Sequence, residues 1–460
     1  MTSSSRDPSS FAPFISNLAT TPILTKAYMN SQEDEDQRLE RLHFANVLKA
    51  FDDYLPYCLT ANDARRRSLF SLPRAHQQLL ADLGPPLPLP ELQNGSSQVE
   101  RSHGFKSRLD EIDDRIRRNA DLLTLIADES RGFLGPMEED VDNDIQTSHE
   151  SVQGPSGSNS SSSGKGEHQA KGDSGARRRR KVSGQEIEKI QSTLKQFVRD
   201  WTKEGEAERS GVYAPLVDAV TKRYGEISFE NRGHVRILVP GAGLGRLAFE
   251  YAAQGYSCQG NEFSFYMLLA SHYILNKSSR VNQHTIYPFV HSSSNWRCAD
   301  DMLRAVRIPD VLPSSVPQTS EFSMVAGEFC EVYSKPEEER AWHVVATCFF
   351  IDTAKNVLRY LETMNHLLPI GGHWINAGPL LWHFENSGNS RSASGDSLSI
   401  ELTLEELVQL LPKMGFELEE RCQLGPTPYT GMLNGMLQYH YLPEFFVCRK
   451  VRDIEPASAV

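Results

Sequence analysis

The chain has 460 residues, a formal net charge of −12 at pH 7 and 39% hydrophobic residues. The length predicts up to about three domains, and the acidic balance excludes a protein that binds nucleic acid through its overall charge. The seven cysteines are scattered without a C-x-x-C or H-x-x-x-H pair, so the sequence indicates neither a disulfide framework nor a zinc site.

Targeting features are sparse. Residues 1–24 lack a basic start followed by an apolar core, so no signal peptide is expected. The longest strongly apolar run, residues 344–351, is too short to span a bilayer. The basic run at 177–181 has two interpretations, a nuclear-import or RNA-contacting patch and a solvated charge block in a linker, and the second is favoured because short basic runs are common in linkers.

Composition divides the chain into segments. Residues 1–31 are expected to be disordered, and residues 32–134 are expected to be helical because their apolar residues recur at helical spacing. Residues 135–184 carry an acidic patch, a Ser/Gly tract and the basic run, and they have too few apolar residues to bury a core. The sequence therefore predicts a disordered linker there, a catalytic domain over 185–450 and a tail over 451–460.

A glycine-rich motif lies near the start of the predicted catalytic domain. An apolar, β-branched run ends at a proline, and glycines follow at Gly241, Gly243 and Gly245. After an amphipathic helix pattern, a second short strand ends in Glu262. This is half of a nucleotide-binding βαβ unit, in which the glycines let backbone N–H groups approach a ligand and the acid binds the two hydroxyls of a ribose.

The spacing of the glycines indicates which cofactor is bound. A dinucleotide fingerprint, G-x-G-x-x-G, needs a glycine where this chain has Arg246, and no G-x-x-x-x-G-K-[ST] phosphate loop occurs. The motif therefore suits an adenosine-containing ligand without a pyrophosphate. S-adenosylmethionine fits this requirement, and a nicotinamide-dependent enzyme is disfavoured.

Strands and helices alternate through the rest of the domain. Helices are expected over 263–275, 354–368 and 404–414, and strands over 322–326, 343–351, 373–377, 416–421 and 445–449. Thr403 and Glu406 predict a capping box at the start of the last helix. The alternation predicts an α/β, doubly wound, mostly parallel sheet whose ligand sits at the carboxyl ends of the strands.

Candidate ligand-binding residues follow the predicted strands. Glu328 can accept a hydrogen bond from an adenine amino group, and Phe329 offers an apolar wall with a backbone N–H for the ring. Cys348 lies near the end of the strand expected over 343–351 and could simply be a small core residue. Upstream, Gln196 and Arg199 share one helix face, and arginine is the side chain suited to hold the carboxylate of S-adenosylmethionine with two hydrogen bonds.

Several long motifs, including LKQFVRDW, VPGAGLGRL, FFIDTA and GPLLWHFEN, resemble the carnosine N-methyltransferase family over residues 191–450. The resemblance implies a class I methyltransferase fold and transfer of a methyl group from S-adenosylmethionine to an imidazole nitrogen of carnosine, giving anserine. It places the cofactor-binding residues at Gln196, Arg199, Gly241, Glu262, Glu328, Phe329 and Cys348. It places the dipeptide-binding and catalytic residues at Asp352, His383 and Tyr441.

The chemistry suits these last three side chains. Asp352 is expected to orient the imidazole or take its proton, His383 to bind polar groups of the dipeptide or relay a proton, and Tyr441 to offer a ring face to a partly cationic product. Two alternatives stay open: a methyltransferase of a protein histidine or another imidazole, and an inactive binding protein on the same fold. The expected location is the cytoplasm, with the nucleus as an option, and a homodimer is a possible assembly.

Overall fold

The computed structural model describes residues 30–84, 103–132, 180–385, 399–429 and 434–455, and for residues 30–37 it describes the backbone alone. The predicted N-terminal segment, 1–31, and the predicted linker, 135–184, lie almost entirely outside these ranges. Within the described residues no helix is long and apolar enough to cross a membrane.

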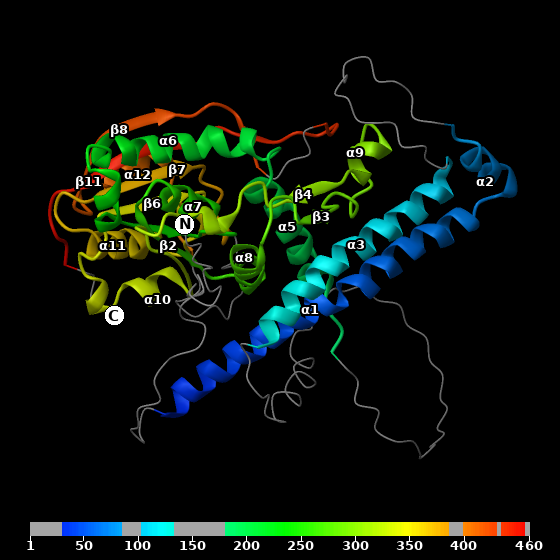
Figure 1. The fold of residues 1–460 in the computed structure, drawn as a ribbon, viewed down its shortest axis with the longest axis horizontal. Coiled ribbons are helices and arrows are strands. Elements are labelled where there is room, and N and C mark those ends of the chain that lie inside the picture. The colour runs from blue at the N-terminus through cyan, green and yellow to red at the C-terminus, as the bar shows by residue number, and fades with distance from the viewer. Residues whose placement is uncertain (1–29, 85–102, 133–179, 386–398, 430–433, 456–460) are drawn as a thin grey trace, which may run out of the picture.

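A seven-stranded sheet forms the centre of the catalytic domain (Figure 1). Its strands, in spatial order, are β5 (Phe322–Ala326), β2 (Ser257–Glu262), β1 (Arg236–Pro240), β6 (Val344–Cys348), β7 (His373–Gly378), β11 (Glu444–Lys450) and β8 (Phe416–Gln423). Neighbouring strands from β5 to β7 are parallel, and β11 is antiparallel to both β7 and β8. The predicted α/β fold with a mostly parallel sheet is confirmed.

Helices cover both faces of the sheet because its central strands are apolar on both sides. In β1, Ile237 and Val239 belong to one hydrophobic core and Leu238 to the other, as the two-residue period of a strand requires. The first core contains residues of α5 (Gly184–Trp201), α6 (Glu206–Tyr224), α7 (Arg246–Ala253) and α8 (Phe265–Lys277). The second contains residues of α10 (Phe329–Tyr333), α11 (Val357–Leu367) and α12 (Leu404–Leu410). The predicted capping box of α12 is present, with Thr403 and Glu406 bonded reciprocally.

The predicted N-terminal helical region is a long hairpin, which lies to one side of the sheet in Figure 1. Its helices are α1 (Asn30–Phe70) and α3 (Phe105–Arg131), with the short α2 (Arg74–Ala81) after α1. One face of each long helix is buried, and these side chains belong to the same hydrophobic core as α5 and α8. The hairpin is therefore packed onto the catalytic domain.

The sequence analysis missed an insertion between α8 and β5. It contains β3 (His284–Ile286), β4 (Val306–Ile308) and α9 (Ala299–Leu303), and the two strands pair antiparallel. Strands of three residues carry too few alternating positions to show a periodic pattern. This insertion packs against α3 of the hairpin.

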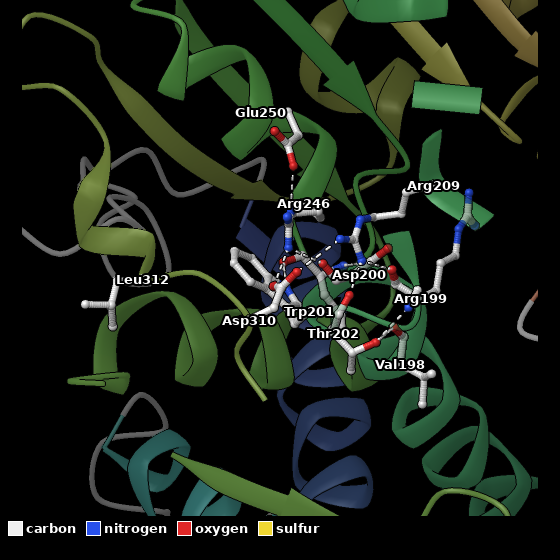
Figure 2. A network of polar contacts seen from close by, with 12 residues as sticks. Val198, Arg199, Asp200, Trp201, Thr202, Arg209, Arg246, Glu250, Asp310 and Leu312 are labelled. Carbon is white, nitrogen blue, oxygen red and sulfur yellow. Dashed lines mark hydrogen bonds and ion pairs between the residues drawn. The ribbon is translucent and has the colours of Figure 1, made fainter. Parts of the chain in front are cut away.

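Asp310, just after β4, binds two buried arginines (Figure 2). Its carboxylate accepts hydrogen bonds from Arg209 on α6 at 3.1 Å and from Arg246 at the start of α7 at 2.6 Å. Arg246 also donates to the carbonyl of Asp200 at 2.8 Å and to Glu250 at 2.6 Å. Arg246, which interrupts the dinucleotide fingerprint, is therefore paired with carboxylate and carbonyl oxygens. It is not among the residues that line the cavity at the carboxyl ends of the strands.

We expect Asp310→Ala to lower the free energy of unfolding by about 3 kcal/mol, because two buried guanidinium groups lose their shared carboxylate. Chemical denaturation of both proteins measures the difference. Arg118→Ala is the control. The side chains of Arg118 and of its partner Asp114 are 56% and 47% exposed, so this ion pair is expected to contribute less than about 1 kcal/mol to the free energy of unfolding. Equal stability of the two variants would contradict the assignment.

Candidate active site

A cavity of about 960 Å³ opens at the carboxyl ends of β1, β2, β5 and β6, the edge at which the sequence predicts a ligand. Most of the predicted ligand-binding residues line it: Gln196, Arg199, Gly241, Gly243, Glu262, Glu328, Phe329, Cys348 and His383. Asp352 and Tyr441 do not line it, although each is bonded or packed against residues that do. The cavity therefore gathers residues that lie far apart in the sequence.

The glycine loop forms one wall of the cavity. Gly241 and Gly243 have φ angles of 65° and 56°, which a side chain would make unfavourable. A Cβ on Gly241 would also lie 2.6 Å from the ring of Phe350. Both positions therefore require glycine, and they leave the loop backbone open to a ligand.

Glu262 lies at the end of β2 and is already held by backbone donors. Its carboxylate accepts from Gly243 at 2.8 Å, from Phe263 at 2.9 Å and from Ser264 at 2.8 Å. Burial raises the pKa of Glu262 above its ordinary value, and these three hydrogen bonds act in the opposite direction. The carboxylate is thus fixed beside the glycine loop, where a ribose would meet it.

Arg199 and Gln196 reach the cavity from α5, as their spacing predicts. The guanidinium of Arg199 lies 4.3 Å from the ring centre of Tyr429 and 5.2 Å from that of Phe349. Its buried Nε has an ion-pair contact with Glu208 at 3.6 Å but no hydrogen-bond partner among the described residues. An arginine that is desolvated in this way suits an anionic group of a ligand in the cavity.

Asp200, which the sequence analysis missed, organises this end of the cavity. Its carboxylate accepts from Gln196 at 3.0 Å, from the hydroxyl of Tyr213 at 3.2 Å and from the backbone N–H of Leu244 at 3.4 Å. It is 1% exposed, so its side chain supports the cavity wall from behind. No short motif marks such a residue, because two of its three partners, Tyr213 and Leu244, come from α6 and from the glycine loop.

The opposite end is aromatic. Phe329 is buried and lies 5.4 Å from Phe350 and 5.3 Å from Tyr360, ring centre to ring centre. Glu328 caps α10 by accepting from the backbone N–H of Glu331 at 2.9 Å. These packed rings give the cavity an apolar wall that suits the flat ring of an adenine.

Asp352 is 3% exposed and fixes the backbone that leads to His383. Its carboxylate accepts from the backbone N–H of Leu381 at 2.8 Å, and its carbonyl accepts from the N–H of His383 at 2.9 Å. Burial raises the pKa of Asp352 above its ordinary value. The structure therefore shows a positioning role for Asp352, while its predicted contact with a substrate stays a prediction.

Tyr441 belongs to an aromatic cluster with Phe349 and Tyr429. It lies on β10 (His440–Tyr441), which pairs with β9 (Thr427–Pro428). Its ring centre is 5.6 Å from that of Phe349 and 6.3 Å from that of Tyr429. Phe349 has a φ of 53°, an uncommon conformation for a residue with a side chain. Tyr429 and Phe349 line the cavity directly, and the sequence analysis missed both.

Cys348 lies beside Arg199, with Sγ 3.8 Å from the arginine Nη2. Burial raises the pKa of its thiol to about 11, so the sulfur is protonated at neutral pH. This thiol is therefore a weakly polar wall and no nucleophile. Among the described residues, no group of three His, Cys, Asp or Glu side chains could hold a metal ion.

Comparison with known proteins identifies relatives of this chain. The family model for carnosine N-methyltransferase matches residues 176–452. A carnosine N-methyltransferase of Schizosaccharomyces pombe is 48% identical over 266 residues, which is 57% of this chain and 71% of that protein. One of Mus musculus is 37% identical over 419 residues, which is 91% of this chain and 88% of that protein.

Solved structures give more distant matches. A SAM-dependent methyltransferase from Methanosarcina mazei is 15% identical with a TM-score of 0.29, and the match covers 47% of this chain and 92% of that one. Magnesium protoporphyrin IX methyltransferase from Synechocystis is 10% identical with a TM-score of 0.30, covering 57% and 99%.

We expect Glu262→Ala to weaken the binding of S-adenosylmethionine and of its demethylated product by about 1.5–3 kcal/mol, at least tenfold in Kd, because a charged acceptor is lost. Isothermal titration calorimetry measures the change. Glu262→Gln, which keeps the size and one acceptor oxygen, is the matched control and should lose less. Wild-type protein that binds NAD as strongly as S-adenosylmethionine would refute the assignment of this cavity.

Proposed function

The chain belongs to the carnosine N-methyltransferase family, and we propose that it transfers a methyl group from S-adenosylmethionine to an imidazole nitrogen of carnosine, giving anserine. The observation that carries the proposal is that the family match, residues 176–452, contains every residue that lines the cavity. The substrate is proposed from the names of the relatives. The cavity contains groups that suit both S-adenosylmethionine and carnosine.

The residues present fit S-adenosylmethionine. The glycine loop and Glu262 suit its ribose, the aromatic wall beside Glu328 suits its adenine, and Arg199 offers a desolvated cation for its carboxylate. When bound, this cofactor supplies a methyl group on a positively charged sulfur. Ordering both reactants in one cavity can lower the barrier by several kcal/mol.

The substrate side must present a neutral imidazole nitrogen to the methyl group. A partner for the other ring N–H selects the tautomer whose attacking nitrogen keeps its lone pair. His383 lines the cavity, and the backbone that carries it is held by Asp352. We infer that these two residues orient the imidazole and that Asp352 takes or shares its proton. Phe349 and Tyr429 line the cavity and provide ring faces for the cationic product, and Tyr441 packs against both rings.

The direct test is incubation of the purified protein with labelled S-adenosylmethionine and a panel of acceptors: carnosine, other histidine dipeptides, histidine and cell lysate. We expect label on carnosine, with mass spectrometry placing the methyl group on the imidazole. Label that enters only protein from the lysate would replace the dipeptide by a protein histidine. Absence of any transfer by protein that binds the cofactor would favour a binding protein.

We expect Asp352→Asn to lower kcat by about 100-fold or more while leaving the Kd of the cofactor within a few-fold. Asparagine keeps an oxygen that can accept from Leu381, so the backbone toward His383 is retained, but it cannot take a proton. Steady-state kinetics and calorimetry measure the two quantities. Wild-type turnover in this variant would show that Asp352 has a purely structural role. Loss of cofactor binding would show that its carboxylate serves the cofactor rather than the imidazole.

The pH dependence follows from two groups that must be deprotonated. A free imidazole has a pKa of about 6.5. Because only the neutral ring can attack, kcat/KM should fall about tenfold per pH unit below that value. Burial raises the pKa of Asp352, so its protonation adds a second loss at lower pH and steepens the acid limb. Asp352→Asn should show the single-group slope alone. A rate that stays constant from pH 8 to pH 5 would contradict a neutral imidazole nucleophile.

A further inference from the structure

The N-terminal hairpin contacts the insertion through buried polar residues that have no part in the proposed catalytic chemistry. Asn119 on α3 is 0% exposed, and its side-chain amide bonds both backbone groups of Tyr287 in the insertion. Its Nδ2 donates to the carbonyl of Tyr287 at 2.9 Å, and its Oδ1 accepts from the N–H of Tyr287 at 2.7 Å. An amide that satisfies both groups of one residue holds that backbone in one position.

A second contact extends this link along the insertion. The hydroxyl of Tyr54 on α1 accepts from Asn119 at 3.1 Å and lies 3.1 Å from Nε2 of His291. Arg65 donates to the carbonyl of His291 at 3.2 Å. Burial, with Lys195 and Arg65 nearby, lowers the pKa of His291 to about 3. The ring is therefore neutral near pH 7, and its contact with Tyr54 joins two uncharged groups.

The same insertion segment holds the loop that leads to Tyr441. The backbone N–H of Met436 donates to the carbonyl of Asn295 at 2.7 Å, and Gly435 forms an isolated antiparallel bridge with Trp296. Asn434 donates to Asp301 in α9 at 3.1 Å. Residues 434–436 are thus attached to the insertion, five residues before Tyr441 and its pairing with β9.

We propose that the hairpin positions the substrate side of the cavity: Asn119 fixes residues 287–296, which anchor residues 434–436 and so set Tyr441 and its aromatic neighbours. This inference rests on the proposed function, because it assigns Tyr441 and Tyr429 to the dipeptide. Asn119 is a positioning residue, since it is separated from the cavity by the insertion and the loop. The hairpin then acts on dipeptide affinity without touching the dipeptide.

The test compares two buried amides of the same hairpin. Asn62 is also 0% exposed, but it donates to Leu109 and Asp113 within the hairpin and, among the described residues, makes no hydrogen bond to the insertion. We expect Asn119→Ala to raise the KM for carnosine about fivefold or more, with kcat and the Kd of S-adenosylmethionine within twofold. Asn62→Ala should leave all three near the wild-type values.

Hydrogen exchange of the peptide that contains Met436 gives a readout independent of activity. It should become faster in Asn119→Ala and stay unchanged in Asn62→Ala. If Asn119→Ala fails to fold, Asn434→Ala at a half-buried position removes a different link, the one between residues 434–436 and Asp301 of the insertion, and should also raise KM. Equal KM values for the two hairpin variants, or unchanged exchange at Met436 in Asn119→Ala, would overturn the proposal. A wild-type enzyme that does not methylate carnosine refutes the proposed function instead, and the exchange comparison still decides the positioning role.

Discussion

The active-site architecture depends on the carboxylate of Asp310, whose side chain is 15% exposed and on which the guanidinium groups of the buried Arg209 and Arg246 converge. Removing the partner of a buried arginine is strongly destabilising, so these ion pairs favour the arrangement that is observed. Its backbone joins in as well, since the N–H of Asp310 donates to the carbonyl of Trp201 at 3.0 Å. The cluster therefore locks the insertion, the end of α5 and the start of α7 together (Figure 2).

The ion pairs of Asp310 bring together two parts of the proposed cofactor site, Arg199 and the glycine loop. The end of α5 carries Arg199, and the start of α7 follows the glycine loop. The indole N–H of Trp201 donates to the carbonyl of Leu244 at 3.1 Å, and Asp200 accepts from the N–H of the same residue. Both backbone groups of Leu244 are thus bound to α5. Contacts within the protein therefore hold together the cation and the loop that we assign to the carboxylate and the ribose of the cofactor, and such positioning of binding groups favours a reaction.

The sequence predicted what depends on local pattern. The alternating strands and helices, the capping box at Thr403 and the cavity position of Glu262 follow from periodicity, from one capping motif and from strand order. The sequence did not predict Asp200 or Asp310, because each gains its role from partners far away in the chain. Asp352 could be predicted only in part. Strand order places it near the cavity, but its hydrogen bond to Leu381 depends on the segment after β7, which lies far away in the chain. Its direct contact with a substrate, the homodimer and the location in the cell stay predictions.

The two carboxylates to which we assign ribose binding and imidazole orientation share one electrostatic property. Burial raises the pKa of Glu262 and of Asp352, so each is less stable as an anion than it would be in water. The same loss of water strengthens the hydrogen bonds that each can make to a ligand, because a charge in a low dielectric interacts more strongly. A cavity that holds a cationic sulfur and generates a cationic imidazole would lower both pKa values again when it is filled. The charges of the reactants and of the protein are thus complementary, and the carboxylates reach their most stable ionised state only in the complex.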